Sequence, residues 1–253
     1  MGWSARQYTS FEAQRTRPAR DLVAAIPVED ARRAVDLGCG PGNSTAVLAA
    51  RYPDAAIVGI DNDDDMLASA RQRLPAIEFV RGDIASWQPA APVDVVLANA
   101  SLQWLPDHAT LYPRLLGALA PGGALAIQTP DNEQEPAHVA LRQVAQAGPW
   151  AAKVANVHTL TRHPPAFYYA LLAPLAHSVE VWRTVYHHPL PNHDAVVEWF
   201  KGSGMRPYLA PLDARERAAF LARYREAIAV GYPALPDGTV LLPFPRLFIV
   251  ATR

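Results

Sequence analysis

Short apolar runs alternate with amphipathic segments along the first half of the chain. An amphipathic helix, interrupted near Arg17-Pro18, is expected at 8–26. The pattern then predicts strands at 34–37, 55–60, 77–80, 93–98 and 124–128, with helices at 43–51, 64–74 and 109–120 between them. Strands that alternate with helices at this spacing are typical of βαβ units, whose strands run parallel in one sheet. The sequence therefore predicts an α/β fold with helices on both faces of a mostly parallel sheet.

The regular alternation ends near residue 130. From there the pattern predicts a helix at 136–147, a strand at 178–186, a helical stretch at 192–232 and a last strand at 244–252. The connection between the final two strands is far longer than the few residues that usually join neighbouring elements. Long insertions over a sheet are often lids, so we expect one domain over 1–253 with helical cap elements within 130–175 and 189–243.

One segment of the first half carries a ligand-binding pattern, Val-Asp-Leu-Gly-Cys-Gly-Pro-Gly-Asn-Ser-Thr at 35–45. Asp36 closes an apolar strand, where a carboxylate is costly unless a neighbouring group requires it. The three glycines permit positive φ and the close approach of a ligand to the backbone. The polar residues at 43–45 are expected to cap the helix that follows. The segment predicts a nucleotide-type site at the carboxyl end of the first strand.

Two common nucleotide motifs do not fit this segment. A dinucleotide fingerprint needs Gly or Ala where Asn43 stands, and a phosphate loop needs a lysine that is absent here. The residues at the ends of the following strands narrow the choice of nucleotide-type ligand. Asp61 ends the second strand, where an acidic residue can accept both ribose hydroxyls. Asp83 ends the third, placed to accept from an adenine amino group beside the apolar Ile84. A polar stretch begins at Asn99, directly after the fourth strand. Four consecutive strands therefore end in polar groups at the same edge of the sheet.

The pattern Asp-x-Gly-x-Gly-x-Gly at 36–42 resembles the first motif of class I S-adenosylmethionine-dependent methyltransferases. The stretches 8–18, 99–107, 181–187 and 244–248 are similar to the trans-aconitate 2-methyltransferase family, and the similarity extends over nearly the whole chain. The resemblance implies a Rossmann-like, seven-stranded sheet with an antiparallel last strand. It also implies methyl transfer from S-adenosylmethionine to one carboxylate of trans-aconitate, giving a monomethyl ester and S-adenosylhomocysteine.

The resemblance implies that the cofactor lies along the strand ends. The expected cofactor contacts are Asp36, Gly38, Cys39, Gly40, Asn43, Asp61, Asn62, Met66, Asp83, Ile84 and Asn99. A small polycarboxylate needs cations and hydrogen-bond donors, for which the candidates are Arg15, Gln103, Trp104, His158, Arg183 and Arg246. Because a carboxylate is already ionised at pH 7, no general base is expected. Alignment of the reacting atoms is then the main task of the enzyme.

Composition limits the alternatives. The chain of 253 residues is half hydrophobic and has a formal net charge of −1, whereas nucleic-acid partners usually require a basic face. Cys39 is the only cysteine, which excludes an internal disulfide and a thiolate zinc site, and no metal is expected. Neither a signal peptide nor an apolar run long enough to span a membrane is found, so we expect a cytoplasmic protein that does not engage membranes.

Several other functions stay open at this point. The acceptor could be another small di- or tricarboxylic acid, or a hydroxyl, and a cofactor-binding module without catalysis is not excluded. A dehydrogenase is disfavoured by Asn43. A nucleic-acid adenine methyltransferase is disfavoured because Asn-Ala-Ser-Leu follows the fourth strand where that class has a Pro-Pro-aromatic run. The sequence does not indicate the oligomeric state.

Overall fold

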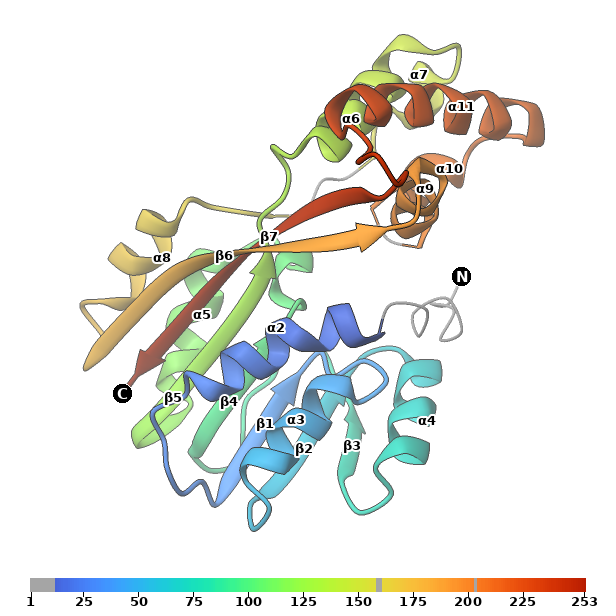
Figure 1. Ribbon diagram of the computed structural model, residues 1–253. Coiled ribbons are helices and arrows are strands. Elements are labelled where there is room, and N and C mark those ends of the chain that lie inside the picture. Colours follow the sequence, from blue (N-terminus) through green and yellow to red (C-terminus); the bar gives the residue numbers. More distant parts are fainter. Residues whose placement is uncertain (1–11, 158–160, 203) are drawn as a thin grey trace. The chain divides into compact units, whose positions relative to one another are not determined.

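The computed structural model describes residues 12–157, 161–202 and 204–253, which separate into two compact units (Figure 1). The first unit contains the described residues up to 130, together with 161–184 and 246–253. The second contains the described residues within 131–159 and 185–245. The candidate His158 lies outside the described residues, and so does the side chain of Arg15.

Seven strands of the described chain form one sheet in the order β3–β2–β1–β4–β5–β7–β6. Their bounds are β1 Arg33–Leu37, β2 Ala56–Asp61, β3 Glu78–Arg81, β4 Val93–Asn99, β5 Leu119–Pro130, β6 Ser178–Leu190 and β7 Val240–Thr252. The first five strands pair in parallel, and β7 pairs antiparallel to β5. This confirms the predicted mostly parallel sheet with an antiparallel last strand.

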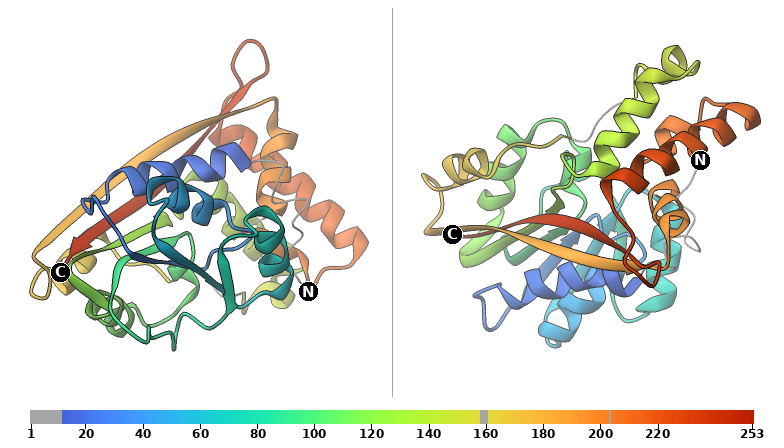
Figure 2. Two further views of the ribbon diagram at one scale, coloured as in Figure 1. Left: turned by 90° about the horizontal axis from the view of Figure 1, so that it is seen from below. Right: turned by 45° about the horizontal axis from the view of Figure 1, so that its top comes forward.

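Helices cover both faces of the sheet in the first unit (Figures 1 and 2). One face carries α2 (Glu12–Ala24), α3 (Asn43–Arg51) and α4 (Asp64–Arg73), and the other carries α5 (His108–Gly117) and α8 (Pro165–Leu172). Leu125, Ile127, Leu247 and Ile249 join the core that α5 and α8 cover. Because successive strand residues point to opposite faces, the even-numbered residues in these parts of β5 and β7 point to the face of α2, which we call the α2 face.

Some helix predictions were wrong in detail. Helix α2 runs through Pro18 without interruption. Pro18 is buried between the buried residues Thr16 and Ala19, so packing outweighs the hydrogen bond that proline removes. Helix α8 and the short α7 (Ala151–Val154) were not predicted. The predicted helical stretch at 192–232 is three helices: α9 (His193–Lys201), α10 (Arg206–Leu209) and α11 (Ala214–Gly231). Strand β6 also continues beyond 186, through Pro189, which an edge strand tolerates.

The second unit is mainly helical and has its own core. Helix α11 packs against α6 (Pro136–Ala147) and α9, and the rings of Trp150 and Phe220 meet at 5.3 Å between centroids. Asp213 and Glu216 form a reciprocal capping box at the start of α11, which satisfies two otherwise free backbone N–H groups. In the described part of the chain, no helix combines the length and apolar character needed to cross a membrane.

Candidate functional site

The glycine turn after β1 is shaped by its contact with the end of β4. Gly38 has φ 76°, and a Cβ there would lie 2.3 Å from the Cβ of Ser101. Ser101 Oγ in turn donates to the carbonyl oxygen of Leu37 at 2.6 Å. The space that Gly38 was expected to leave for a ligand is therefore filled by Ser101. Gly40, at φ 53°, has no atom within 4 Å of its Cβ position, so the open side of the turn lies there.

Asp36 supports the start of α3. Its carboxyl group is fully buried, and Oδ2 accepts from Ser44 Oγ and Thr45 Oγ1, both at 2.7 Å. The predicted capping role of the two hydroxyls is wrong, because Gly42 is the N-cap without a side-chain hydrogen bond. The predicted cofactor contact of Asp36 stays a prediction. Burial raises the pKa of Asp36 to about 6.

Cys39 and Met66 also pack beneath the glycine turn. Their residues are only 3% and 5% exposed. Cys39 belongs to a small core with Phe79 and residues of α4, and burial raises the pKa of its thiol. The backbone N–H groups of Gly38 and Cys39 both donate to the carbonyl of Ile60, at 2.7 and 3.0 Å. Both side chains therefore pack beneath the turn, and the cofactor contacts of these two residues stay predictions.

Asp61, at the end of β2, is fixed from two sides. Its Oδ2 accepts from the backbone N–H of Gly40 at 2.8 Å, and its Oδ1 accepts from that of Asp63 at 3.0 Å. The residue is half-buried, and each carboxylate oxygen can accept a second hydrogen bond. This geometry fits the predicted ribose contact, since a pair of hydroxyls needs two acceptors on one fixed carboxylate. The adjacent Asn62 is exposed.

Asp83 follows β3 and is exposed to solvent. Its Oδ1 accepts from the backbone N–H of Ala85 at 2.9 Å, which orients the carboxylate. Ile84 is half-buried and packs against the core beside α5. A polar acceptor next to an apolar side chain suits an aromatic base with an amino group. The contacts of both residues with adenine stay predictions.

A cluster of buried polar side chains lies where β4, β5 and β7 meet. We call Asn99, Gln103, Gln128 and Arg246 the amide cluster. Asn99 stands opposite Gln128 in the β4–β5 ladder, and Arg246 Nη1 lies 3.5 Å from Gln128 Oε1. The short helix η1 (Leu102–Trp104) carries Gln103, whose Nε2 donates to the carbonyl of Ala100 at 2.7 Å. The N–H of Ala100 donates to the carbonyl of Gln128 at 2.8 Å, which connects the parts of the cluster.

Three amide atoms of this cluster are buried without a hydrogen-bond partner: Asn99 Oδ1, Gln103 Oε1 and Gln128 Nε2. Gln103 is 3% exposed and Gln128 is 1% exposed. Buried polar atoms are nearly always hydrogen-bonded in folded proteins, so several exceptions at one place need an explanation. A bound ligand that supplies the missing partners is such an explanation. Gln128 was missed in the sequence, although a glutamine inside the apolar run Ala-Leu-Ala-Ile-Gln was a usable signal.

Comparison with known proteins identifies the family. Residues 34–123 match the family model described as a methyltransferase domain. A trans-aconitate 2-methyltransferase of Methylobacterium radiotolerans is 53% identical over 255 residues, covering 99% of this chain and 98% of that protein. The protein of the same name from Rhizobium meliloti is also 53% identical, over 100% of this chain and 99% of its own. The chain belongs to the trans-aconitate 2-methyltransferase family.

Solved structures agree with this family at the level of the fold. A SAM-dependent methyltransferase from Thiobacillus denitrificans, solved with S-adenosyl-L-homocysteine, has a TM-score of 0.56, 21% identity and full coverage of both chains. The family and the fold together confirm the predicted class, a Rossmann-like methyltransferase that uses S-adenosylmethionine.

Two of the substrate candidates, Arg183 and Trp104, do not lie in the interior of the amide cluster. Trp182 stacks on Phe248 with ring centroids 4.9 Å apart, and Phe248 points to the α2 face. Arg183, the next residue of β6, therefore points to the opposite face from Arg246, and it is exposed. This separates Arg183 from the amide cluster and corrects its predicted place beside Arg246. Trp104 is 57% exposed, so it borders the cluster through η1 rather than forming part of its interior.

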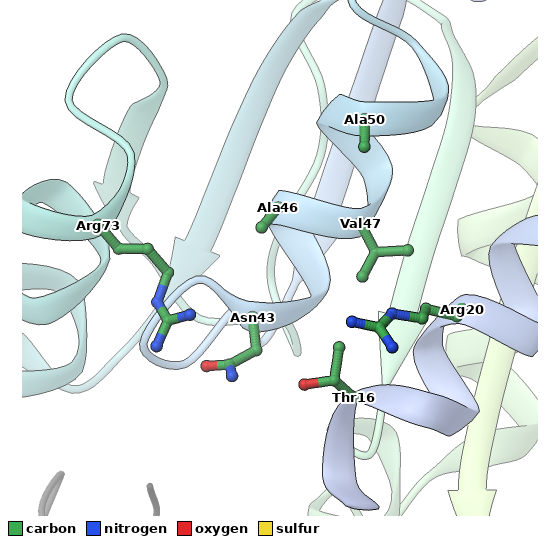
Figure 3. A pocket seen from close by; sticks show the side chains of 7 residues that line it. All are labelled: Thr16, Arg20, Asn43, Ala46, Val47, Ala50 and Arg73. Atoms are coloured by element: carbon green, nitrogen blue, oxygen red, sulfur yellow. The ribbon is translucent and has the colours of Figure 1, made fainter. Parts of the chain in front are cut away.

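A surface pocket of about 720 Å³ lies on the outer side of α3 (Figure 3). It is lined by Thr16, Arg20, Asn43, Ala46, Val47, Ala50 and Arg73. The guanidinium group of Arg20 and the hydroxyl of Thr16 extend from α2 toward Asn43, at the first turn of α3. Arg20 and Arg73 give the pocket a positive lining. Asn43, a predicted cofactor residue, therefore faces this pocket.

Proposed function

We propose that this chain transfers the methyl group of S-adenosylmethionine to one carboxylate of trans-aconitate, producing the monomethyl ester and S-adenosylhomocysteine. The observation that carries the proposal is the near-complete match, at about half identity, to proteins named trans-aconitate 2-methyltransferase. The amide cluster gives independent support, because it combines a buried cation with hydrogen-bonding groups that lack partners. Arg246 and the Gln128 Nε2 donor suit a carboxylate, whereas Asn99 Oδ1 and Gln103 Oε1 are acceptors that suit a donor group.

The residues at the strand ends fit the cofactor. Asp61 retains lone pairs for the ribose hydroxyls, and Gly40 leaves open space beside the turn. The acceptor atoms of Asn99 and Gln103 suit a donor such as the ammonium group of the methionine part. When bound, S-adenosylmethionine supplies a methyl group on a positively charged sulfur, which a carboxylate oxygen can attack directly.

The side chains of the amide cluster suit an acceptor that is already ionised. None of its four members is a base at neutral pH, and a carboxylate does not need one. Arg246 is 6% exposed, so its charge is poorly screened by water and attracts a carboxylate more strongly than a surface arginine would. The contribution of the chain is therefore to hold the carboxylate in line with the methyl group and to exclude water. That the helical second unit helps to close the site stays a prediction.

The cofactor assignment is tested by Asp61→Ala, with the exposed Asp54→Ala as the matched control. Loss of the charged acceptor should weaken binding of S-adenosylhomocysteine in calorimetry by at least roughly 1.5–3 kcal/mol, the range for one hydrogen bond to a charged group. The control should bind as the wild type does. If Asp61→Ala bound S-adenosylhomocysteine as tightly as the wild type does, the assignment of Asp61 to the cofactor site would be wrong.

The substrate assignment is tested with methyl-labelled S-adenosylmethionine and a panel of di- and tricarboxylic acids, with ester formation followed by mass spectrometry. Trans-aconitate should be the preferred acceptor, and rising salt should raise its KM because screening weakens the attraction of a polyanion. If the protein preferred another acid, the reaction class would stand and the assigned substrate would be wrong. Methylation of a neutral alcohol, together with inactivity on every acid, would contradict the proposal.

A further inference from the structure

We propose that Gln128 is a specificity-determining residue that binds a substrate carboxylate together with Arg246. This rests on the proposed function and adds to it a residue outside the predicted site. Gln128 lies in β5, two register pairs from the end of its ladder with β7, where Pro130 stands opposite Arg246. Both side chains point to the α2 face, since 128 pairs with 248 and 130 with 246 in the same antiparallel ladder.

The surroundings of Gln128 fix the direction of its amide. Its Oε1 faces the guanidinium group of Arg246, which can only donate, at 3.5 Å from Nη1. A flipped amide would instead point two donors at each other. Phe248 stands directly across from Gln128 in the ladder and is held by its stack on Trp182. The Nε2 donor must therefore point away from Arg246, and it has no partner among the described residues.

A buried N–H donor without a partner, next to a buried guanidinium, is complementary to a carboxylate. The guanidinium supplies charge and the amide supplies a second, neutral donor at a fixed angle. A neutral donor raises affinity without a second positive charge, which would bind any anion. Gln128 therefore favours carboxylic acids that place one carboxylate at Arg246 and a second acceptor at Gln128 Nε2. A monocarboxylate uses only part of this site and is bound less well.

Two substitutions of Gln128 separate this role from a structural one. Gln128→Met keeps the size of the side chain and removes the donor, and KM for trans-aconitate should rise roughly 10- to 100-fold, the equivalent of one hydrogen bond to a charged group. Gln128→Glu adds a carboxylate that pairs with Arg246 and repels the substrate, so the rise in KM should be larger. Gln143→Glu, on the exposed side of α6, is the control with the same change in charge.

The readouts are KM and kcat for trans-aconitate, KM for a monocarboxylate that the wild type methylates, and calorimetric affinity for S-adenosylhomocysteine. We expect KM for trans-aconitate to change most, and cofactor affinity to stay within about threefold of wild type. In the double variant, the effects of Gln128→Met and Arg246→Lys on KM for trans-aconitate should be less than additive in free energy, because Arg246 orients the amide of Gln128.

Wild-type KM in Gln128→Met, or an equal loss of cofactor affinity and KM, would overturn the assignment of Gln128. If Gln128→Glu fails to fold, Gln128→Met still decides the question, since an apolar side chain is tolerated in a position that is 1% exposed. A wild-type protein that methylates none of the acids would instead overturn the proposed function. The two failures are therefore distinguishable.

Discussion

The burial of Asp36 predicts a pH-dependent stability that one substitution should remove. Its carboxyl group is fully buried and accepts the hydroxyls of Ser44 and Thr45. Asp36→Asn keeps the shape of the side chain and retains an oxygen that can accept both hydroxyls. It loses the capacity to ionise, and its amide NH2 replaces Oδ1, which has no hydrogen-bond partner; the cost of that NH2 does not depend on pH. The variant therefore isolates the effect of placing a negative charge in the core beneath α3.

The magnitude follows from the pKa of Asp36, which burial raises from 3.8 to about 6. A group whose pKa is higher in the folded state favours folding when it is protonated, and this contribution is lost as the pH rises from the unfolded-state to the folded-state pKa. At about 1.4 kcal/mol per pKa unit, the total loss is about 3 kcal/mol. About 2 kcal/mol of it should fall between about pH 4.5 and about pH 7.5, where unfolding can be measured.

The assay is urea unfolding of the wild type and Asp36→Asn across this pH range, without cofactor. All other titrating groups are common to both proteins, so the difference in free energy of unfolding reports Asp36 alone. Relative to the wild type, the variant should gain about 2 kcal/mol as the pH rises. Asn62→Ala, which changes no titrating group at an exposed position, should give a constant difference. A constant difference for Asp36→Asn as well would show that Asp36 is not a desolvated carboxylate.

Two further predictions concern the packing around the site. Gly38→Ala should lower the free energy of unfolding by about 2 kcal/mol or more, because a positive φ already costs about 1–2 kcal/mol for alanine and the new Cβ would lie 2.3 Å from that of Ser101. Gly122→Ala, at φ 79° with no atom within 4 Å, should show the φ cost alone in the same urea titration; equal losses would contradict the contact. His108→Phe should cost about 2–4 kcal/mol, since two buried groups each lose a partner: the Leu102 carbonyl, 2.9 Å from Nε2, and the Tyr168 hydroxyl, 2.8 Å from Nδ1. A loss below about 1 kcal/mol would contradict this network.

The first half of the fold could be predicted because its local patterns and its tertiary structure agree. The helix at 43–51 and the start of the helix at 64 were predicted correctly, since a glycine turn precedes one and Asp63 caps the other. The region after 147 was predicted less well. Apart from α11, its helices are short, and they are limited by residues such as Pro165, Gly202 and Asp213, whose effect depends on tertiary packing.

The candidate site was predictable in its position but not in the role of each residue. Four polar strand ends on one edge follow directly from parallel strands, and Asp61 occupies the expected place. The sequence could not show that Asp36 and Cys39 point inward, because inward and ligand-facing carboxylates or thiols produce the same pattern. It also could not separate Arg183 from Arg246. Which face of the sheet an arginine points to depends on the register of β6 and β7, and that register is a tertiary property.

A series of hydrogen bonds connects the glycine turn to the amide cluster along the sheet edge. Ser101 Oγ joins the end of β4 to the carbonyl of Leu37 in β1, and the N–H of Ala100 joins it to Gln128 in β5. Gln128 in turn accepts from Arg246 in β7. The loop assigned to the methyl donor and the pair assigned to the carboxylate are therefore fixed to the same strands. An enzyme that needs no proton transfer gains its rate chiefly from such alignment. A small displacement of the β4 end should consequently reduce kcat even where both ligands still bind.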